Sequence, residues 1–298
     1  MRPYEISISE DDTLSRLLLS TTLKKSGYEV IATENGRDAW GFFQQEHIPA
    51  IISDWINNIR KPAIIGHRGA GHLAPENTMA AINMAVASNL DAVELDIQAS
   101  ADHALVIFHD ERLDRTTDGA GILNEWSLEA LRRLDAGAWF DARYQKEPIP
   151  ILAEVLSCFP DGLMAFLELK NQECVEPLGK LIRHHHAEEW CVVLSFSDQI
   201  LQRVSDLFPI IKRAYIHHQQ ADVSDLLNRI TSLPADFIGL FPSHMVPENV
   251  EPCRQAGLQI LTGPVNDMDT LHKILFLSPD YILSDCPDLI QNALYPTP

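Results

Sequence analysis

The sequence predicts an α/β fold: a TIM (β/α)8 barrel over residues 61–298 with a small inserted subdomain, preceded by an incomplete βαβαβ segment. Short apolar runs recur with helical patterns between them, as in parallel strands that helices cover on both sides. From residue 61 these runs fill eight strand positions, over a length close to the roughly 250 residues of a typical barrel. The 298 residues are 46% hydrophobic and 22% charged, a composition typical of a globular protein.

The first sixty residues alternate strand and helix patterns. The predicted elements, in order, are strand Glu5–Ser9, helix Leu14–Lys25, strand Glu29–Thr33, helix Gly36–Glu46 and strand Ala50–Ser53. A polar stretch over residues 57–62 follows and resembles a linker. The boundary is therefore predicted between a unit of residues 1–60 and a barrel of residues 61–298.

Eight strand positions are predicted in the barrel. They are Ala63–Gly66, Ala92–Ile97 joined with Leu105–Phe108, Met164–Leu169, Cys191–Phe196, Ile211–Ile216, Phe237–Phe241, Gln259–Thr262 and Tyr281–Ser284. Counting the two runs of the second position as one is an interpretation that gives the number eight. The segment over residues 114–150 is too long for a simple loop and is expected to form the inserted subdomain.

Charge argues against nucleic acid and anionic membranes as partners, and cysteine usage indicates the compartment. The formal net charge is −19, so long-range electrostatics repel nucleic acid and anionic membranes. The sequence offers neither a secretion signal nor an apolar run long enough for a membrane anchor. Five cysteines with no C-x-x-C pair indicate free thiols. A cytoplasmic location is expected.

Four charged side chains are predicted to meet at one rim of the barrel. Side chains in a strand alternate between faces, so Glu94 and Asp96 point the same way, as do Glu168 and Lys170. Two carboxylates on a strand that is otherwise buried repel each other unless a cation offsets them. Because the carboxyl ends of parallel strands converge, this pattern predicts one divalent cation, Ca²⁺ or Mg²⁺, on Glu94, Asp96 and Glu168.

Two histidines end neighbouring apolar runs. His67 follows Ala63–Gly66, and His109 follows Leu105–Phe108. Imidazole exchanges protons near neutral pH, and displacement at a phosphodiester needs a base on one side of phosphorus and an acid on the other. Arg68, beside His67, can donate to two phosphoryl oxygens at once. These residues predict a phosphodiesterase.

The same residues carry a resemblance to a known family. In order, the motifs are Gly66-His67-Arg68-Gly69, Pro75-Glu76-Asn77-Thr78, Glu94-Leu95-Asp96, His109-Asp110, Glu168-Leu169-Lys170, Ser195-Phe196 and Ser284-Asp285-Cys286-Pro287. This series resembles the glycerophosphodiester phosphodiesterase family over most of residues 63–288. Each motif alone is weak, whereas the first five, found in this order and with plausible spacing, are specific.

The resemblance implies a TIM barrel enzyme that hydrolyses glycerophosphodiesters to sn-glycerol 3-phosphate and an alcohol. It implies His67 and His109 as the acid–base pair, and attack on phosphorus by the glycerol hydroxyl before water opens a cyclic phosphate. Four residues are expected to bind phosphate or substrate: Arg68, Lys170, Glu76 and Phe196. Glu76 is expected either to border the metal or to orient Arg68. Gly263 stands where similar proteins usually carry tryptophan, which removes an apolar wall near the substrate.

The N-terminal segment resembles part of a response-regulator receiver domain. Asp11, Asp12 and Asp54 match its acidic pocket and phosphoacceptor, but the segment is about half the needed length. A half-receiver buries little apolar surface and leaves strand edges unpaired. We therefore expect no useful phosphorylation, and we expect the edge to dock on the barrel or to pair between chains in a homodimer.

Several alternatives remain open from the sequence. The enzyme can instead act on lysophospholipids or related lipids, or the chain can be a non-catalytic, receiver-linked signalling or binding protein. Lys170 can be an ordinary ion-pair partner of Glu168. The run His184–His186 is interpreted as a solvated helix end, because consecutive helical residues point in different directions. Trp126, Trp139 and Phe140 are interpreted as a small core of the insertion.

Overall fold

The computed structural model describes residues 5–9, 20, 29–33, 50–53, 61–217, 226, 229, 232, 234–275 and 277–295. The chain separates into two compact units, Met1–Arg60 and Lys61–Pro298. The acids Asp11, Asp12 and Asp54 lie outside the described residues, as do the helix predicted over residues 36–46 and, except for Ser20, the one over residues 14–25.

The first unit contains a three-stranded parallel sheet. Its strands are β1 (Glu5–Ser9), β2 (Glu29–Thr33) and β3 (Ala50–Ser53), in the order β2-β1-β3. Glu5 lies opposite Glu29, and Ile6 lies opposite Ala50, so β1 is the central strand of the sheet. The three strands coincide with those that the sequence predicted.

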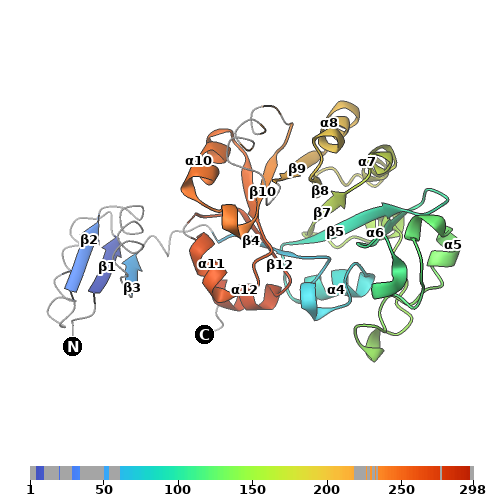
Figure 1. Cartoon of the computed structure of the whole chain (residues 1–298), viewed down its shortest axis with the longest axis horizontal. Helices are drawn as coiled ribbons and strands as arrows, with labels where there is room; N and C mark the ends of the chain where they lie inside the picture. Colours follow the sequence, from blue (N-terminus) through green and yellow to red (C-terminus); the bar gives the residue numbers. More distant parts are fainter. Residues whose placement is uncertain are drawn as a thin grey trace. The chain divides into compact units, whose positions relative to one another are not determined.

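Eight parallel strands close into a barrel in the second unit, which confirms the predicted fold. The strands are β4 (Ala63–Gly66), β5 (Ala92–Ala99), β7 (Met164–Leu169), β8 (Cys191–Ser195), β9 (Lys212–Ile216), β10 (Phe237–Leu240), β11 (Gln259–Thr262) and β12 (Tyr281–Ser284). The first strand, β4, pairs with both β5 and the last strand, β12, and thereby closes the ring (Figure 1). Strands β8 and β10 end one residue earlier than predicted, so Phe196 and Phe241 belong to the loops that follow them.

The second strand position is a hairpin rather than a single strand. Strand β6 (Leu105–Ile107) runs antiparallel to the last part of β5, with Ile97 opposite Ile107 and Ala99 opposite Leu105. The Phe108 amide also donates to the Asp96 carbonyl over 2.9 Å. The hairpin therefore returns the chain to the end of β5 and brings His109 to the rim of the barrel.

Helices surround the barrel strands (Figure 1). They are α4 (Met79–Ala87), α6 (Leu152–Ser157), α7 (Val175–His184), α8 (Asp198–Leu207), α10 (Pro247–Gln255), α11 (Met268–Leu275) and α12 (Pro287–Leu294), with 3₁₀ turns at Gly71–Leu73, Gln172–Cys174 and Pro242–His244. Side chains from alternate strand positions fill two cores. Val93, Leu95 and Ile97 pack against the helices, whereas Phe166 and Phe237 belong to the core inside the barrel.

The predicted insertion follows β6 and has a core of its own. It contains α5 (Leu128–Leu131) and 3₁₀ turns at Leu113–Arg115, Leu123–Glu125 and Ala142–Tyr144. Trp126 packs against the core of this insertion, but the side chain of Trp139 is 43% exposed, so only Trp126 fits the interpretation as core. At the end of α7, His184 and His186 are exposed, as expected of a solvated helix end. Within the described residues, no helix combines the length and apolar character needed to cross a membrane.

Candidate active site

Three carboxylates meet at the rim of the barrel. Glu94 and Asp96 project from β5, and Glu168 projects from β7, where it lies opposite Asp96 in the strand register. One carboxylate oxygen from each residue lies within 4.8 Å of the other two. Glu94 is 3% exposed and Asp96 is 1% exposed, so the cluster is largely shielded from water. The structure thus brings together the three side chains that strand alternation predicted to share a rim.

The carboxylates experience different electrostatic surroundings. Burial, together with repulsion from Asp96, raises the pKa of Glu94 and that of Glu168. Burial alone would raise the pKa of Asp96 as well, but the Lys170 ammonium and His109 hold it below its usual value. The Glu94 Oε1 atom is buried and has no hydrogen-bond partner. The cluster therefore holds negative charge that its protein neighbours offset only in part.

Asp96 is the best-anchored of the three acids. The Lys170 Nζ atom donates to its Oδ1 over 2.9 Å and lies 3.9 Å from Glu168, so Lys170 pairs with both acids. The amide of Asn77 donates to Asp96 Oδ2 over 2.8 Å, and its carbonyl oxygen accepts from the Asp96 backbone amide. Asn77 has a φ of 56°, a left-handed conformation that asparagine tolerates better than most residues.

Arg68 stands beside the cluster in a strained turn. Its φ is 52°, and its backbone amide donates to Glu94 Oε2 over 2.9 Å. The guanidinium Nη1 donates to Glu76 over 2.8 Å, while Nε lies 3.8 Å from Asp96 and has no hydrogen-bond partner. Gly69 follows with a φ of 107°, and a Cβ there would lie 2.6 Å from that of Ala81. Close packing against α4 thus requires glycine after Arg68.

Each predicted catalytic histidine is held at Nδ1 by a carboxylate. His67 Nδ1 lies 2.5 Å from Asp285 Oδ1, and His109 Nδ1 lies 2.6 Å from Asp110 Oδ1. A carboxylate can only accept a hydrogen bond, so both imidazoles carry a proton on Nδ1 and have Nε2 available for proton transfer. The Nε2 of His67 lies 3.8 Å from Glu94 Oε2.

Further hydrogen bonds fix these two histidine–carboxylate pairs. Asn266 donates to Asp285 Oδ2 over 2.7 Å, and its carbonyl oxygen accepts from the Asp285 amide. The hydrogen bond from His67 lowers the pKa of Asp285 to about 2, so this carboxylate is ionised. Burial alone would lower the pKa of His67, but Asp285 and Glu94 raise it. Gln98 Nε2 lies 2.6–3.0 Å from the backbone carbonyl oxygens of residues 108–110.

Arg115 connects the insertion to both halves of the site. Its Nη1 and Nη2 atoms donate to Glu76 over 2.8 and 2.7 Å, and its Nε donates to Asp110 over 2.6 Å. Glu76 in turn accepts from Arg68. Glu76 therefore pairs with two arginines, Arg68 and Arg115, and its role in orienting Arg68 stays a prediction.

Replacing Arg115 by glutamine is expected to lower kcat by roughly tenfold to a hundredfold while changing KM less. The variant keeps an amide donor but loses the forked contacts that orient Asp110 and Glu76, and through them His109 and Arg68. Steady-state kinetics would measure the effect. Arg112→Gln is the matched control, because Arg112 pairs with exposed Asp114 and should leave both constants unchanged. Equal effects of the two variants would contradict this role.

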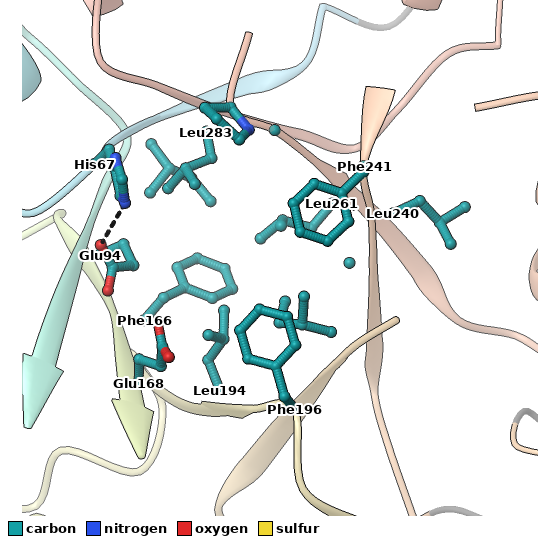
Figure 2. Close-up of a pocket in the computed structure, with 15 residues that line it drawn as sticks. His67, Glu94, Phe166, Glu168, Leu194, Phe196, Leu240, Phe241, Leu261 and Leu283 are labelled. Atoms are coloured by element: carbon teal, nitrogen blue, oxygen red, sulfur yellow. Dashed lines mark ion pairs between the residues drawn. The ribbon is translucent and has the colours of Figure 1, made fainter. Parts of the chain in front are cut away.

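An apolar pocket opens beside the carboxylates (Figure 2). His67, Glu94 and Glu168 line one side, and Phe241 and Leu261 lie across from them. Phe196 also lines this pocket, so the structure places it with the site as predicted from its motif. Gly263 lines the same pocket, and a Cβ there would lie 2.6 Å from the Leu283 carbonyl oxygen. The backbone at residue 263 therefore has no room for any larger side chain without moving.

Several residues of the site escaped prediction from the sequence. Asp110 and Asp285 lie in the motifs His109-Asp110 and Ser284-Asp285-Cys286-Pro287, and these motifs were the available signal for both. Asn77 lies in a motif but was given no role. Arg115 had no signal at all, because its partners lie five and 39 residues away in the sequence.

Comparison with known proteins identifies similar chains. Residues 67–289 match the Glycerophosphoryl diester phosphodiesterase family. A protein named glycerophosphodiester phosphodiesterase from Caldanaerobacter subterraneus subsp. tengcongensis is 30% identical over 240 residues, which cover 78% of this chain and 98% of the relative.

Solved structures agree with the sequence comparison. A glycerophosphodiester phosphodiesterase from Agrobacterium tumefaciens superposes with a TM-score of 0.68 and 32% identity, covering 77% of this chain and 98% of that one. A phosphodiesterase from Oleispira antarctica, solved with the product sn-glycerol-3-phosphate, superposes with a TM-score of 0.72 and 31% identity. That match covers 78% of this chain and 96% of the other.

Proposed function

The chain belongs to the glycerophosphoryl diester phosphodiesterase family, and from that premise we propose that it hydrolyses glycerophosphodiesters with two histidines and one divalent cation. The products are sn-glycerol 3-phosphate and an alcohol. One observation carries the proposal: the buried acids Glu94 and Asp96 and the half-buried acid Glu168 lie beside His67, and a carboxylate holds the Nδ1 atom of this histidine. A second histidine, His109, is held in the same way at the same rim.

The carboxylate cluster is suited to a divalent cation. Three acids with oxygens within 4.8 Å of one another, two of them with a raised pKa, would gain from a positive charge between them. The Glu94 Oε1 atom is buried and has no hydrogen-bond partner, so it could serve as a ligand atom for such an ion. Oxygen-only ligands favour Ca²⁺ or Mg²⁺ over softer metals. When bound, such a cation would polarise a phosphoryl oxygen and offset the charge that develops on it.

The chain's own side chains would carry the proton transfers and position the phosphate. One of His67 and His109 takes a proton at Nε2 from the hydroxyl that attacks phosphorus, and the other gives a proton to the leaving oxygen. Asp285 and Asp110 keep the two rings in the required tautomer. Arg68 and Lys170 stand at the same rim and offset phosphate charge.

Incubation with glycerophosphocholine is expected to release sn-glycerol 3-phosphate, which a coupled dehydrogenase assay would measure. Parallel assays with glycerophosphoethanolamine and with a micellar lysophospholipid would separate the soluble diesters from the lipid alternative. Tight binding of these diesters without any product would instead favour the non-catalytic alternative. Release of phosphocholine together with glycerol, from cleavage on the other side of phosphorus, would contradict the proposed bond cleavage.

For the N-terminal unit we propose a truncated receiver-like fold that holds two chains together. Its strand order, β2-β1-β3, is the same as the order of the first three strands in a doubly wound sheet of the order 2-1-3-4-5. Deletion of residues 1–60 is expected to convert a dimer into a monomer without loss of turnover, because the candidate site lies wholly within residues 61–298. Light scattering after size exclusion would measure the mass. A full-length monomer would contradict the dimer.

A cytoplasmic location also belongs to this proposal. All five cysteines fall within described residues and carry free thiols. Three of them are buried, and burial raises the pKa of Cys174 and of Cys253 to about 11, which leaves these thiols protonated and unreactive. Such thiols are typical of proteins in a reducing compartment. Fractionation of cells that express the full chain would test the location.

A further inference from the structure

The pocket beside the carboxylates is apolar on every side except one. Its volume is about 220 Å³. Its charged or polar side chains are those of His67, Glu94 and Glu168, which form the edge facing the candidate catalytic groups. From this geometry, and resting on the proposed function, we propose that the preferred substrate is a phosphodiester with a hydrocarbon substituent, and that the pocket receives this substituent.

The size of the pocket exceeds what a small polar alcohol requires. An apolar cavity of about 150 Å³ suffices to hold a benzene ring. By that measure the pocket has room for a hydrocarbon group of roughly six to ten carbon atoms. The pocket is continuous with the catalytic edge, because His67 and Glu94 belong to both. A group that enters it can therefore be attached to a phosphate bound at the carboxylates.

The chemistry of the walls favours hydrocarbon over water or a polar head group. The walls that the strands provide consist of aliphatic side chains, which cannot form hydrogen bonds: Ile65, Leu194, Ile216 and Leu261. The backbone groups of these strands are hydrogen-bonded to the neighbouring strands of the barrel. Water needs two to four polar partners to be held stably, and a polar head group loses its hydration without replacement. An aliphatic chain gains by entering the same space.

Tight packing behind the walls fixes the shape of the pocket. At Gly239 a Cβ would lie 2.3 Å from Ile216 Cδ1, and at Gly263 it would lie 2.6 Å from Leu283 Cβ. At Gly263 the contact is with the Cβ and the backbone of Leu283, so a side chain there would have to displace the main chain, whereas at Gly239 the end of the Ile216 side chain would have to move. Glycine at both positions therefore keeps this space open. Phe196 and Phe241 complete the wall from the loops after β8 and β10 (Figure 2).

Two substrate series would test this assignment with the full-length protein and added Ca²⁺ or Mg²⁺. One series is sn-glycero-3-phosphoethanol, -butanol, -hexanol and -octanol, with the hydrocarbon on the alcohol side. The other is glycerophosphocholine with ethyl to octyl ethers on the sn-1 oxygen, which leaves the sn-2 hydroxyl free to attack and puts the hydrocarbon on the other side of phosphorus. We expect kcat/KM to rise roughly two- to fourfold per methylene in one series until the pocket is full. The series that shows this rise identifies which side enters.

A pocket-filling variant makes the test specific to the pocket. Leu283→Trp is expected to lower the octyl-to-ethyl ratio of kcat/KM by about tenfold or more, because the indole occupies the space of several methylenes. Leu207→Trp is the matched control: Leu207 is 43% exposed at the end of α8 and should leave the ratio unchanged. Thermal unfolding of both variants would verify that they fold.

The outcomes separate the pocket from the reaction. If short diesters are hydrolysed but neither series gains with chain length, the pocket assignment fails while the proposed function stands. A preference for glycerophosphocholine over its neutral carbon isostere, the 3,3-dimethylbutyl diester, would mean that the pocket selects a quaternary ammonium and would overturn the assignment as well. Absence of turnover for every diester would overturn the proposed function and this inference together. If Leu283→Trp does not fold, the wild-type series decides.

Discussion

Replacement of Asp96 by asparagine is expected to reduce kcat/KM by at least roughly 10³-fold. Asp96 is the acid on which the other parts of the site depend, because Lys170, Asn77 and the proposed cation all share its two oxygens. Asparagine preserves the shape but removes the charge, so Lys170 loses its ion-pair partner at 2.9 Å. Loss of a cation that contributes several kcal/mol of transition-state stabilisation corresponds to about that factor.

Kinetics and calorimetry together would check this expectation. Titration of Ca²⁺ or Mg²⁺ into the wild type should show one binding event per chain, and the Asp96→Asn variant should show weakened binding. Chelator should abolish turnover of the wild type, and added cation should restore it. Asp161→Asn is the matched control, since Asp161 is exposed in the turn before β7. Full activity in excess chelator would disprove the metal-dependent mechanism.

Replacement of either His67 or His109 by alanine is expected to lower kcat by roughly 10²- to 10⁴-fold, the usual contribution of a positioned acid or base. The double variant should lose little more than the worse single variant, because residues that act in one reaction step are not additive. The measurement is kcat with glycerophosphocholine. His184→Ala, at the exposed end of α7, should leave kcat unchanged.

The leaving group would distinguish the two histidines. A diester with a nitrophenol leaving group needs little protonation as it departs, so loss of the acid should matter far less for that substrate than loss of the base. Equal defects of both variants on both substrates would rule out the division into acid and base. Turnover by the double variant at the wild-type rate would eliminate both residues from catalysis.

The sequence predicted those parts of the site that local geometry determines. Strand alternation alone is enough to place Glu94 with Asp96 and Glu168 with Lys170, because the period of a strand does not depend on tertiary contacts. The same reasoning could not show that Leu105–Ile107 runs antiparallel to β5. An apolar run has no direction until its partner strand is known, and the hairpin that carries His109 came only from the structure.

The residues that hold the histidines were harder to predict because their contacts span the chain. Asp285 bonds a residue 218 positions earlier, and Arg115 bonds Glu76 across 39 positions. No periodicity in the sequence relates such pairs, since closure of the barrel and the path of the insertion bring them together. The apolar pocket escaped prediction for the same reason: each strand contributes one or two side chains, and its volume exists only once the strands are assembled.

Closure of the barrel between β4 and β12 has a consequence for the synthesis of this protein on the ribosome. The His67 amide donates to the Ser284 carbonyl, and its ring bonds Asp285, so the first strand of the barrel depends on the last for both backbone and side-chain partners. A nascent chain that has passed residue 170 already carries every proposed metal ligand and both histidines. It nevertheless lacks the carboxylate that fixes one of them until residue 285 has emerged. Catalytic competence should therefore arise late in translation, and premature termination should yield inactive fragments.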